Sequence, residues 1–462
     1  MHDTPLHHYL RAIWSAAGGP ASDLAHTAFT GDGALPSVFA VSDFAAAAMA
    51  GAGLALASLV AARGGQRPAV RVDRRLASFW FATSLRPQGW SLPPAWDPVA
   101  GDYAARDGWI RLHTNAAHHR AAALAVLGAP ADKDALAQAV AGWNMDELET
   151  TVLARGGCAG AMRPQADWAL HPQGQAVAVE PLLHSAATGS GPALAWAPTP
   201  ERPLAGIRVL DATRILAGPV ATRCLAGFGA QVLRIDPPGW EEPGLAPEVT
   251  LGKRCARLDL KDAAGRAAFE RLLGEADVFV HGLRPDALER LGLGAAQRQR
   301  ICRGLVDVCL DAYGWSGPWQ GRRGFDSIVQ MSTGIAEAGM RLGRRDRPTP
   351  LPVQALDQAA GYLLAMAAVR GLQRRLETGQ GSQWRASLAR TAALLASMPP
   401  GAEGLANALR PEEADDLAPG LEATPWGPAR RLLPPLALDG AAMRWDLPAT
   451  ALGSAAPRWA DA

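Results

Sequence analysis

The chain has 462 residues, a length that predicts roughly two to four domains, each able to bury a sizeable core. Its formal net charge is +1, which excludes a strong electrostatic field toward nucleic acid or an acidic membrane surface. We therefore expect no nucleic-acid partner and no membrane partner.

The first residues and the cysteines indicate the compartment. The opening MHDTPLHHYL lacks the basic-then-apolar pattern of a signal peptide. The five cysteines are scattered and show no metal-ligand spacing. We expect a cytoplasmic protein with reduced, mostly buried thiols and no metal site. The Ala-rich stretch 45–62 comes nearest to a membrane span, but its small residues favour a packed helix.

The first half of the chain predicts a long helix followed by a small α/β module. Gly, Pro and Ser replace the periodic pattern at 189–203, so we place a boundary near residue 200. A proline-rich link over 87–98 precedes the module. The expected elements are a helix over 43–63, a strand over 69–79, a strand over 109–114 beside the Asp107-Gly108 turn, and helices over 133–142 and 145–155.

The second half, residues 201–400, alternates strands with helices. This pattern predicts an α/β fold with a Rossmann-like, mostly parallel sheet and helices on both faces. The last residues, 401–462, are rich in Pro, Ala and Gly, and we expect an irregular wrap over the surface. The expected strands cover 207–211, 231–235, 255–260, 276–280 and 305–310, and the expected helices begin near Pro219 and cover 263–275 and 286–291.

The turn after the first of these strands carries Ala217-Gly218-Pro219 and no glycine triad. Without a G-x-G-x-x-G turn the backbone cannot pack closely on a pyrophosphate, so a dinucleotide is not the expected ligand. Phosphates bound at this edge of the sheet would need side-chain cations instead. The candidates near the expected strand ends are Lys253, Arg254, Arg290, Arg322 and Arg323.

The segment that begins at Asp43 echoes the segment that begins at Asp357. The two segments align without gaps, each residue of the first with the residue 314 positions later. The identical residues include the Asp, a Gly-Gln pair and an Arg. Both segments predict a helix with an acidic residue at its head. Alanine richness accounts for part of the likeness.

The second half resembles the family III CoA-transferases (CaiB/BaiF), the group of formyl-CoA and carnitine CoA-transferases that also contains the α-methylacyl-CoA racemases. The first half is similar to the later part of the same family, so the chain resembles the family's two parts in reversed order. The resemblance is carried by PLAGIRVLDATRILAGPVATRCLAGFGAQVLRID (203–236), GKRCARLDLKDAAGR (252–266), ADVFVHGLRPDALERLGLG (276–294), YGWSGPWQGRRGFDSIVQMSTG (313–334) and LPVQALDQAAGYLLA…LETGQGSQW (351–384).

The resemblance implies a CoA-transferase that takes acyl-CoA and a free carboxylic acid as substrates, with no permanently bound cofactor and no metal. It also implies a homodimer, because family members pair as interlocked rings. The residues that it assigns to coenzyme A are Leu216, Ala217, Arg254, Leu283, Arg290, Arg323 and Phe325. The chain departs from the family at Gly282-Leu283, where a polar-aromatic pair is common, and at Pro237-Pro238, where a basic residue is common.

Asp357 matches the family's nucleophile, an aspartate at the head of the helix before the T-G-x-G segment. The implied reaction is CoA transfer through an aspartyl-CoA thioester, with backbone N–H groups at the helix start stabilising the oxyanion. The plain alternative is an N-cap, since Asp often precedes an alanine-rich helix. Asp43 heads the echoed helix without an α/β unit before it, and we interpret it as an N-cap.

Two other activities remain open. Racemisation needs an acid/base group on each face of the α-carbon. The racemase branch of the family supplies one of them from the His of a G-H-D triplet, where this chain has Gly324-Phe325-Asp326. Transferase is therefore favoured over racemase or epimerase. A degenerate, non-catalytic CoA-binding protein is the third reading. His113, His118 and His119 are expected to pack or lie at the surface rather than bind metal, since adjacent helical residues face apart.

Overall fold

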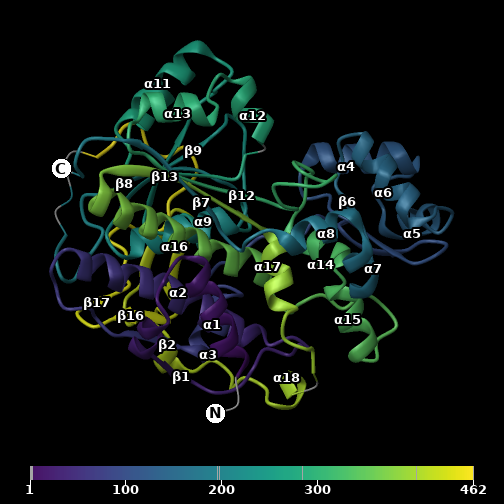
Figure 1. Ribbon diagram of the computed structural model, residues 1–462. Coiled ribbons are helices and arrows are strands. Elements are labelled where there is room, and N and C mark those ends of the chain that lie inside the picture. The colour runs from purple at the N-terminus through teal and green to yellow at the C-terminus, as the bar shows by residue number, and fades with distance from the viewer. Residues whose placement is uncertain (1–3, 195, 197, 284, 402, 461–462) are drawn as a thin grey trace.

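A computed structural model of the protein describes residues 4–194, 196, 198–283, 285–401 and 403–460, and a seven-stranded sheet forms its centre (Figure 1). The strand order is β10-β9-β8-β11-β12-β13-β7, and every neighbouring pair is parallel except β13 with β7. The six parallel strands therefore have the 3-2-1-4-5-6 order of a doubly wound sheet. The strands are β7 (His184–Ser190), β8 (Arg208–Ala212), β9 (Gln231–Asp236), β10 (Lys253–Arg257), β11 (Val278–His281), β12 (Val306–Asp311) and β13 (Gln380–Ser387).

Helices cover both faces of this sheet, as the alternating sequence pattern predicts (Figure 1). One face packs on α9 (Ala217–Gly227) and α16 (Ala355–Thr378) within the largest apolar core. The other face packs on a smaller apolar core under α11 (Ala263–Gly274), α12 (Pro285–Arg290) and α13 (Ala295–Ile301). The Rossmann-like fold is confirmed. β10 begins two residues before the expected start at 255, and β11 begins two residues after the expected start at 276. The strands β7 and β13 of this sheet were not predicted.

The predicted small α/β module has its own apolar core and projects from one side of the body (Figure 1). A three-stranded antiparallel sheet in the order β4-β5-β6 forms its base. Four helices from both halves of the chain lie between the module and the body. The module consists of β4 (Gly101–Ala104), β5 (Trp109–Leu112), β6 (Ala159–Ala161), α4 (Ala117–Leu127), α5 (Lys133–Val140) and α6 (Met145–Ala154), and the four helices are α7 (Gln165–Leu170), α8 (Pro172–Val179), α14 (Asp326–Ser332) and α15 (Ile335–Leu342).

The two ends of the chain pair with each other, which corrects two expectations. The segment 69–79 is a strand only over β2 (Val70–Asp73) and then turns into α3 (Arg74–Trp80). The last residues are an irregular wrap only in part, because four short strands there join two small sheets with β1, β2 and β3, while residues 443–460 contain no helix or strand. These elements are β1 (Thr27–Thr30), β3 (Leu85–Pro87), β14 (Glu422–Thr424), β15 (Gly427–Arg431), β16 (Leu436–Leu438) and β17 (Ala441–Ala442), with the short helices α10 (Ala246–Val249) and α18 (Glu403–Ala406).

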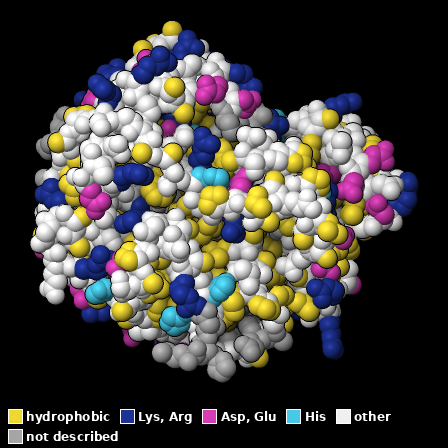
Figure 2. All heavy atoms as spheres, viewed as in Figure 1, with side chains coloured by type: hydrophobic (Ala, Val, Ile, Leu, Met, Phe, Trp, Pro, Cys, Tyr) yellow, Lys and Arg dark blue, Asp and Glu magenta, His cyan; other side chains and the backbone are white. Residues whose placement is uncertain are grey.

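Helix α2 (Val41–Ala62) has the length and hydropathy of a membrane span, yet 89% of its most apolar window is buried inside the protein. It packs along α16 and against α1 (Pro5–Ala16). The expectation of a packed helix is confirmed. All five cysteines are buried and unpaired, and basic and acidic side chains are scattered over the face that Figure 2 shows, without a patch of one sign.

The sequence echo corresponds to a structural repeat. α2, β2 and α3 occur in the same order as α16, β13 and α17 (Leu388–Leu395). Asp73 accepts a hydrogen bond from Leu76 N at the start of α3, and Ser387, 314 positions later, accepts one from Arg390 N at the start of α17. Equivalent caps at equivalent positions show that the two segments fold alike, so composition alone does not explain the echo.

Asp43 is not an N-cap. Helix α2 begins at Val41 with Ala40 as the N-cap residue, and Asp43 lies in the first turn. Its Oδ1 atom accepts a hydrogen bond from Arg74 Nε at 2.5 Å. Asp357 occupies the same place in α16, two residues after Ala355. The two aspartates therefore share a helical position and differ in their partners.

The carboxylate of Glu248 in α10 ties three distant segments together. It accepts hydrogen bonds from the hydroxyl and the N–H of Ser84, forms an ion pair with Arg223 of α9, and contacts Arg431 of β15. Burial alone would raise the pKa of Glu248, but Arg223, Arg431 and the Ser84 hydroxyl outweigh it and lower the pKa to about 2. This buried cluster holds both ends of the chain against the sheet.

We predict that Glu248→Gln lowers the free energy of unfolding by about 3–5 kcal/mol, because it leaves buried guanidinium groups without their counter-charge. The folded pKa of about 2 lies below the value of about 4.3 of an unfolded Glu, so the stabilisation is complete above about pH 4.3 and is lost as the pH falls toward 2. Denaturant unfolding at several pH values measures both effects. Glu275→Gln, which removes an exposed partner of Arg208, should cost less than about 1 kcal/mol.

Candidate functional site

A pocket of about 1030 Å³ lies between the module and the carboxyl ends of the parallel strands. In a doubly wound sheet the ligand crevice forms where the strand order reverses, which here is between β8 and β11. Both halves of the chain line the pocket. The lining segments are 94–98, 113 and 115–119 from the first half, and 212–218, 239–245, 282–283, 310–312 and 321–325 from the second, with Asp357 at the floor.

The turn after β8 is built without the glycine triad and instead carries a strained residue. Ile215 has a φ of 67°, a left-handed conformation that β-branched residues rarely adopt. Its N–H donates to Glu242 Oε1 at 2.7 Å, and the same oxygen accepts from Trp240 Nε1 at 2.9 Å. The other oxygen of Glu242 accepts from Arg234 at 2.8 Å. Glu242 therefore fixes the turn from the loop that follows β9.

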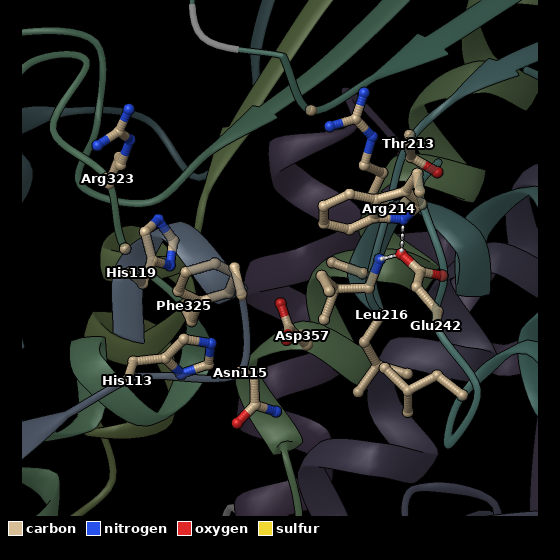
Figure 3. A pocket seen from close by; sticks show the side chains of 18 of the residues that line it. His113, Asn115, His119, Thr213, Arg214, Leu216, Glu242, Arg323, Phe325 and Asp357 are labelled. Carbon is tan, nitrogen blue, oxygen red and sulfur yellow. Dashed lines mark hydrogen bonds between the residues drawn. The ribbon is translucent and has the colours of Figure 1, made fainter. Parts of the chain in front are cut away.

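Asp357 reaches the pocket because α16 crosses the start of α9 at close range. A Cβ atom at Gly361 would lie 2.6 Å from the carbonyl oxygen of Ala217 and 2.7 Å from Val220. Only glycine permits this approach. Asp357 lies one turn before Gly361, so the crossing places its carboxylate beside the Ala217-Gly218 turn, where Figure 3 shows it pointing into the open space.

A second carboxylate supports the start of α16. Asp326 Oδ2 accepts hydrogen bonds from Leu356 N at 2.8 Å and from Asp357 N at 2.9 Å. Burial, followed by the neighbouring Asp326 carboxylate, raises the pKa of Asp357 well above its usual range. Burial also raises the pKa of Asp326, against the hydrogen bonds from these two amides and from Gln330. The two carboxyl groups titrate as a pair.

These hydrogen bonds correct the expectation that backbone N–H groups at the start of α16 stabilise the oxyanion. The first four amides of α16 are already occupied: two by Asp326, one by Val353 O and one by Gln354 O. Nearby, the N–H groups of Ala217 and Gly218 at the start of α9 donate to none of the described residues. The free donors that border the pocket therefore belong to α9.

Opposite this turn, an aromatic wall faces Asp357 (Figure 3). The His113 ring stacks on Phe325 with centroids 3.9 Å apart, and His119 meets the same Phe325 ring edge-on at 5.9 Å. Burial lowers the pKa of His113 to about 3, and the nearby His119 and Arg111 add to the effect. Burial likewise lowers the pKa of His119 to about 4, helped by His118 and Arg323. Both imidazoles are neutral at pH 7. The predicted packing role therefore holds for both histidines. Among the residues that the structure describes, no group of three or more His, Cys, Asp or Glu side chains is placed to hold a metal ion.

The pocket brings together most of the predicted site residues. Three predicted cations are elsewhere. Arg254 lies within β10, at the end of the sheet away from the pocket, and donates to Arg458 O at 3.2 Å. Arg290 is 63% exposed and pairs with Asp286 at 2.5 Å. Lys253 is fully buried against Asp211. The predicted residues that line the pocket are Leu216, Ala217, Leu283, Arg322, Arg323, Phe325 and Asp357.

Sequence reasoning missed Arg214, Trp240, Glu242 and Asp326. Arg214 follows a strand directly, and that position alone is a signal for a ligand contact at this edge of a sheet. Asp326 stands in the quoted Gly-Phe-Asp triplet, but its contact with the amide of Asp357 spans 31 residues and leaves no local pattern.

The model of CoA-transferase family III matches residues 204–424 of the chain, which contain the six parallel strands of the central sheet and Asp357. A probable fatty acyl-CoA transferase of Mycobacterium tuberculosis is 35% identical over 197 residues, which are 39% of this chain and 49% of the relative. A succinyl-CoA–D-citramalate CoA-transferase of Chloroflexus aurantiacus is 32% identical over 196 residues, 39% of this chain and 48% of the relative. The chain thus spans about half the length of these relatives.

Among solved structures, a CaiB/BaiF family protein from Brucella suis is 25% identical, with a TM-score of 0.39 over 49% of this chain and 65% of the other.

We predict that Asp326→Asn lowers the pKa of Asp357. The substitution removes a like charge and keeps a side-chain oxygen that can accept the two amide hydrogen bonds. Carbon-13 NMR of protein with labelled aspartate carboxyl groups, assigned by comparison with Asp357→Asn, measures the titration. In the wild-type protein Asp357 should lose its proton at a higher pH than exposed aspartates, and in the variant at a lower pH than in the wild type. An unchanged titration would show that the two carboxyl groups are not coupled.

Proposed function

We propose that the protein, whose residues 204–424 match the model of CoA-transferase family III, is a CoA-transferase that moves coenzyme A between an acyl-CoA and a free carboxylic acid. The observation that carries the proposal is the position of Asp357, a buried carboxylate that faces a large pocket at the switch point of the sheet. We also infer that residues 1–200 supply, in reversed order, the part that follows the sheet in the family.

The reaction would run through Asp357 in balanced steps. The carboxylate attacks the thioester carbonyl, a carbon–oxygen bond forms, and CoA leaves as the thiolate, which gives a mixed anhydride. The thiolate then attacks the aspartyl carbonyl and releases the free acid, which leaves an aspartyl-CoA thioester. The acceptor carboxylate repeats both steps in reverse and regenerates the carboxylate of Asp357. Covalent catalysis of this kind divides one difficult exchange into easier steps.

The surroundings of Asp357 suit this role. Burial and Asp326 destabilise the anion, and a poorly solvated carboxylate is a stronger nucleophile than one in water. The N–H groups of Ala217 and Gly218 at the positive end of α9 would stabilise the oxyanion that forms on the attacked carbonyl. The neutral wall of His113, His119 and Phe325 would shield the anhydride from water.

A racemase on the same fold is the main rival. Phe325 has no proton to exchange, and burial lowers the pKa of the His113 imidazole stacked on it to about 3, which leaves it a weak base for removing an α-proton. Exchange of the α-hydrogen of an acyl-CoA in D₂O, without transfer of CoA to a labelled acid, would favour the racemase. CoA binding without either reaction would favour a non-catalytic CoA-binding protein.

We predict that Asp357→Asn reduces the exchange of a radiolabelled acid into acyl-CoA by about 10³-fold or more, because the amide lacks the nucleophilic anion. Asn keeps the size of the side chain, so the thermal midpoint should stay close to that of the wild type. The assay is exchange between an acyl-CoA and its own carbon-14-labelled acid, over a panel of acyl groups.

Asp43→Asn is the matched control. Asp43 occupies the same helical position in the repeat but is bound to Arg74, outside the pocket. Its variant should retain exchange within a factor of about two. Full activity in Asp357→Asn, or loss of activity in Asp43→Asn alone, would contradict the assignment.

A further inference from the structure

Arg214 is half-buried and differs from the fully buried arginines around the sheet. Arg234 pairs with Asp236 and Glu242, and Arg223 pairs with Glu248. Within the described parts of the chain, the Arg214 guanidinium forms no hydrogen bond and no ion pair. It lies over the indole of Trp240, whose ring centre is 4.7 Å from the guanidinium carbon. A partly enclosed cation without a paired carboxylate is unusual, because a charge withdrawn from water without a partner is costly.

The backbone beside Arg214 is held in a costly conformation. The left-handed φ of Ile215 is unfavourable for a β-branched residue and persists only where the surroundings enforce it. Glu242 enforces it by accepting the Ile215 N–H, and the same oxygen orients Trp240 through its indole N–H. One buried carboxylate therefore fixes both the turn that carries Arg214 and the ring on which Arg214 rests. Strain of this kind clusters at ligand sites.

Arg214 and Arg323 lie on opposite walls at one end of the pocket. Figure 3 shows both above Asp357, Arg323 on the wall of His119 and Phe325 and Arg214 on the wall of Glu242, with His113 and Asn115 lower in the view. Arg323 keeps donors free after one hydrogen bond to Gly156 O at 2.7 Å, and Arg322 is engaged with Glu149 at 2.9 Å. Two guanidinium groups that face one end of a pocket offer planar, multiple donors of the kind that bind phosphate.

We propose that Arg214, stacked on Trp240 and positioned by Glu242, binds the phosphates of coenzyme A. The inference rests on the proposed function, because the ligand is the acyl-CoA of that reaction. Arg214 would supply the charge that the resemblance expects from Arg254 and Arg290, neither of which lines the pocket. It would also replace the basic residue whose place after β9 is taken by Pro237-Pro238. Glu242 acts as a positioning residue and does not touch the substrate.

The electrostatics agree with this geometry. Burial lowers the pKa of Arg214, and the carboxylates of Asp236 and Glu242 oppose the shift. The group stays cationic at neutral pH, since an arginine titrates far above 7. A bound phosphate would give this cation the partner that it lacks, and the indole face of Trp240 would hold the guanidinium plane in place.

The test compares donors that differ only in their phosphates: acyl-CoA, acyl-dephospho-CoA without the 3′-phosphate, and acyl-pantetheine without any phosphate. For Arg214→Ala we expect the KM for acyl-CoA to rise about 10- to 100-fold, as loss of a charge-assisted hydrogen bond predicts, with little change in kcat. The KM for acyl-pantetheine should not change. If the rise persists with acyl-dephospho-CoA, Arg214 binds the diphosphate; if it disappears, Arg214 binds the 3′-phosphate.

Three further variants test the charge of Arg214, its stacking on Trp240 and the specificity of the effect. Arg214→Lys keeps the charge and should recover part of the affinity, and Trp240→Leu should raise the KM for acyl-CoA by a smaller factor than Arg214→Ala. Arg341→Ala, which removes an exposed arginine of α15 outside the pocket, should change nothing. A rise for Arg290→Ala without one for Arg214→Ala overturns the proposal, as does an equal rise with acyl-pantetheine.

Calorimetric titration with free CoA separates this proposal from the proposed reaction. If the wild-type protein binds CoA and transfers none, the reaction is wrong, while a 10- to 100-fold weaker Kd in Arg214→Ala still supports the phosphate site. An unchanged Kd in Arg214→Ala overturns the phosphate site whether or not the protein is active.

Discussion

The close crossing of α16 over the start of α9 is the contact on which the site depends. Gly361 has no side chain, so the backbone of α16 lies against the carbonyl oxygen of Ala217 and the side chain of Val220. The crossing brings the first turn of α16 to the edge of the sheet where the strand order reverses, and Asp357 is in that turn. A bulkier residue at 361 would separate the two helices and move the carboxylate away from the free amides of α9.

Buried carboxylates then hold the loops around this crossing. Asp326 binds two amides at the start of α16, Glu242 binds the strained amide of Ile215, and Glu248 joins α9 to both ends of the chain. Each is satisfied by several donors, which is the condition under which a buried charge is tolerated. Asp357 is the exception, since its carboxylate accepts no hydrogen bond from the described residues. An anion left without partners in a pocket is available for chemistry.

Periodicity sufficed for five parallel strands of the central sheet and for the helix that carries Asp357, but not for β13 and the antiparallel β7. The strands 207–211, 231–235, 276–280 and 305–310 were recognisable because short apolar runs alternate with helical patterns. The strand pairs at the two ends of the chain were not, because they are short and their partners lie hundreds of residues apart. A shift of two residues in β10 was enough to misplace Arg254, since it moved that residue from a loop into a strand. The place of Arg214 just after a strand marked it as a possible ligand contact, but its lack of an ionic partner and its stacking on Trp240 depend on the Ile215 turn, which no local pattern predicts.

Trapping the aspartyl thioester tests the central claim most directly. The protein is incubated with a competent acyl-CoA and then with hydroxylamine, which converts an aspartyl thioester to a hydroxamate, and the digested peptides are mapped by mass spectrometry. The account predicts a hydroxamate at Asp357, dependent on acyl-CoA, and none at Asp43. Label at Asp43, or turnover with no label at any aspartate, would contradict it.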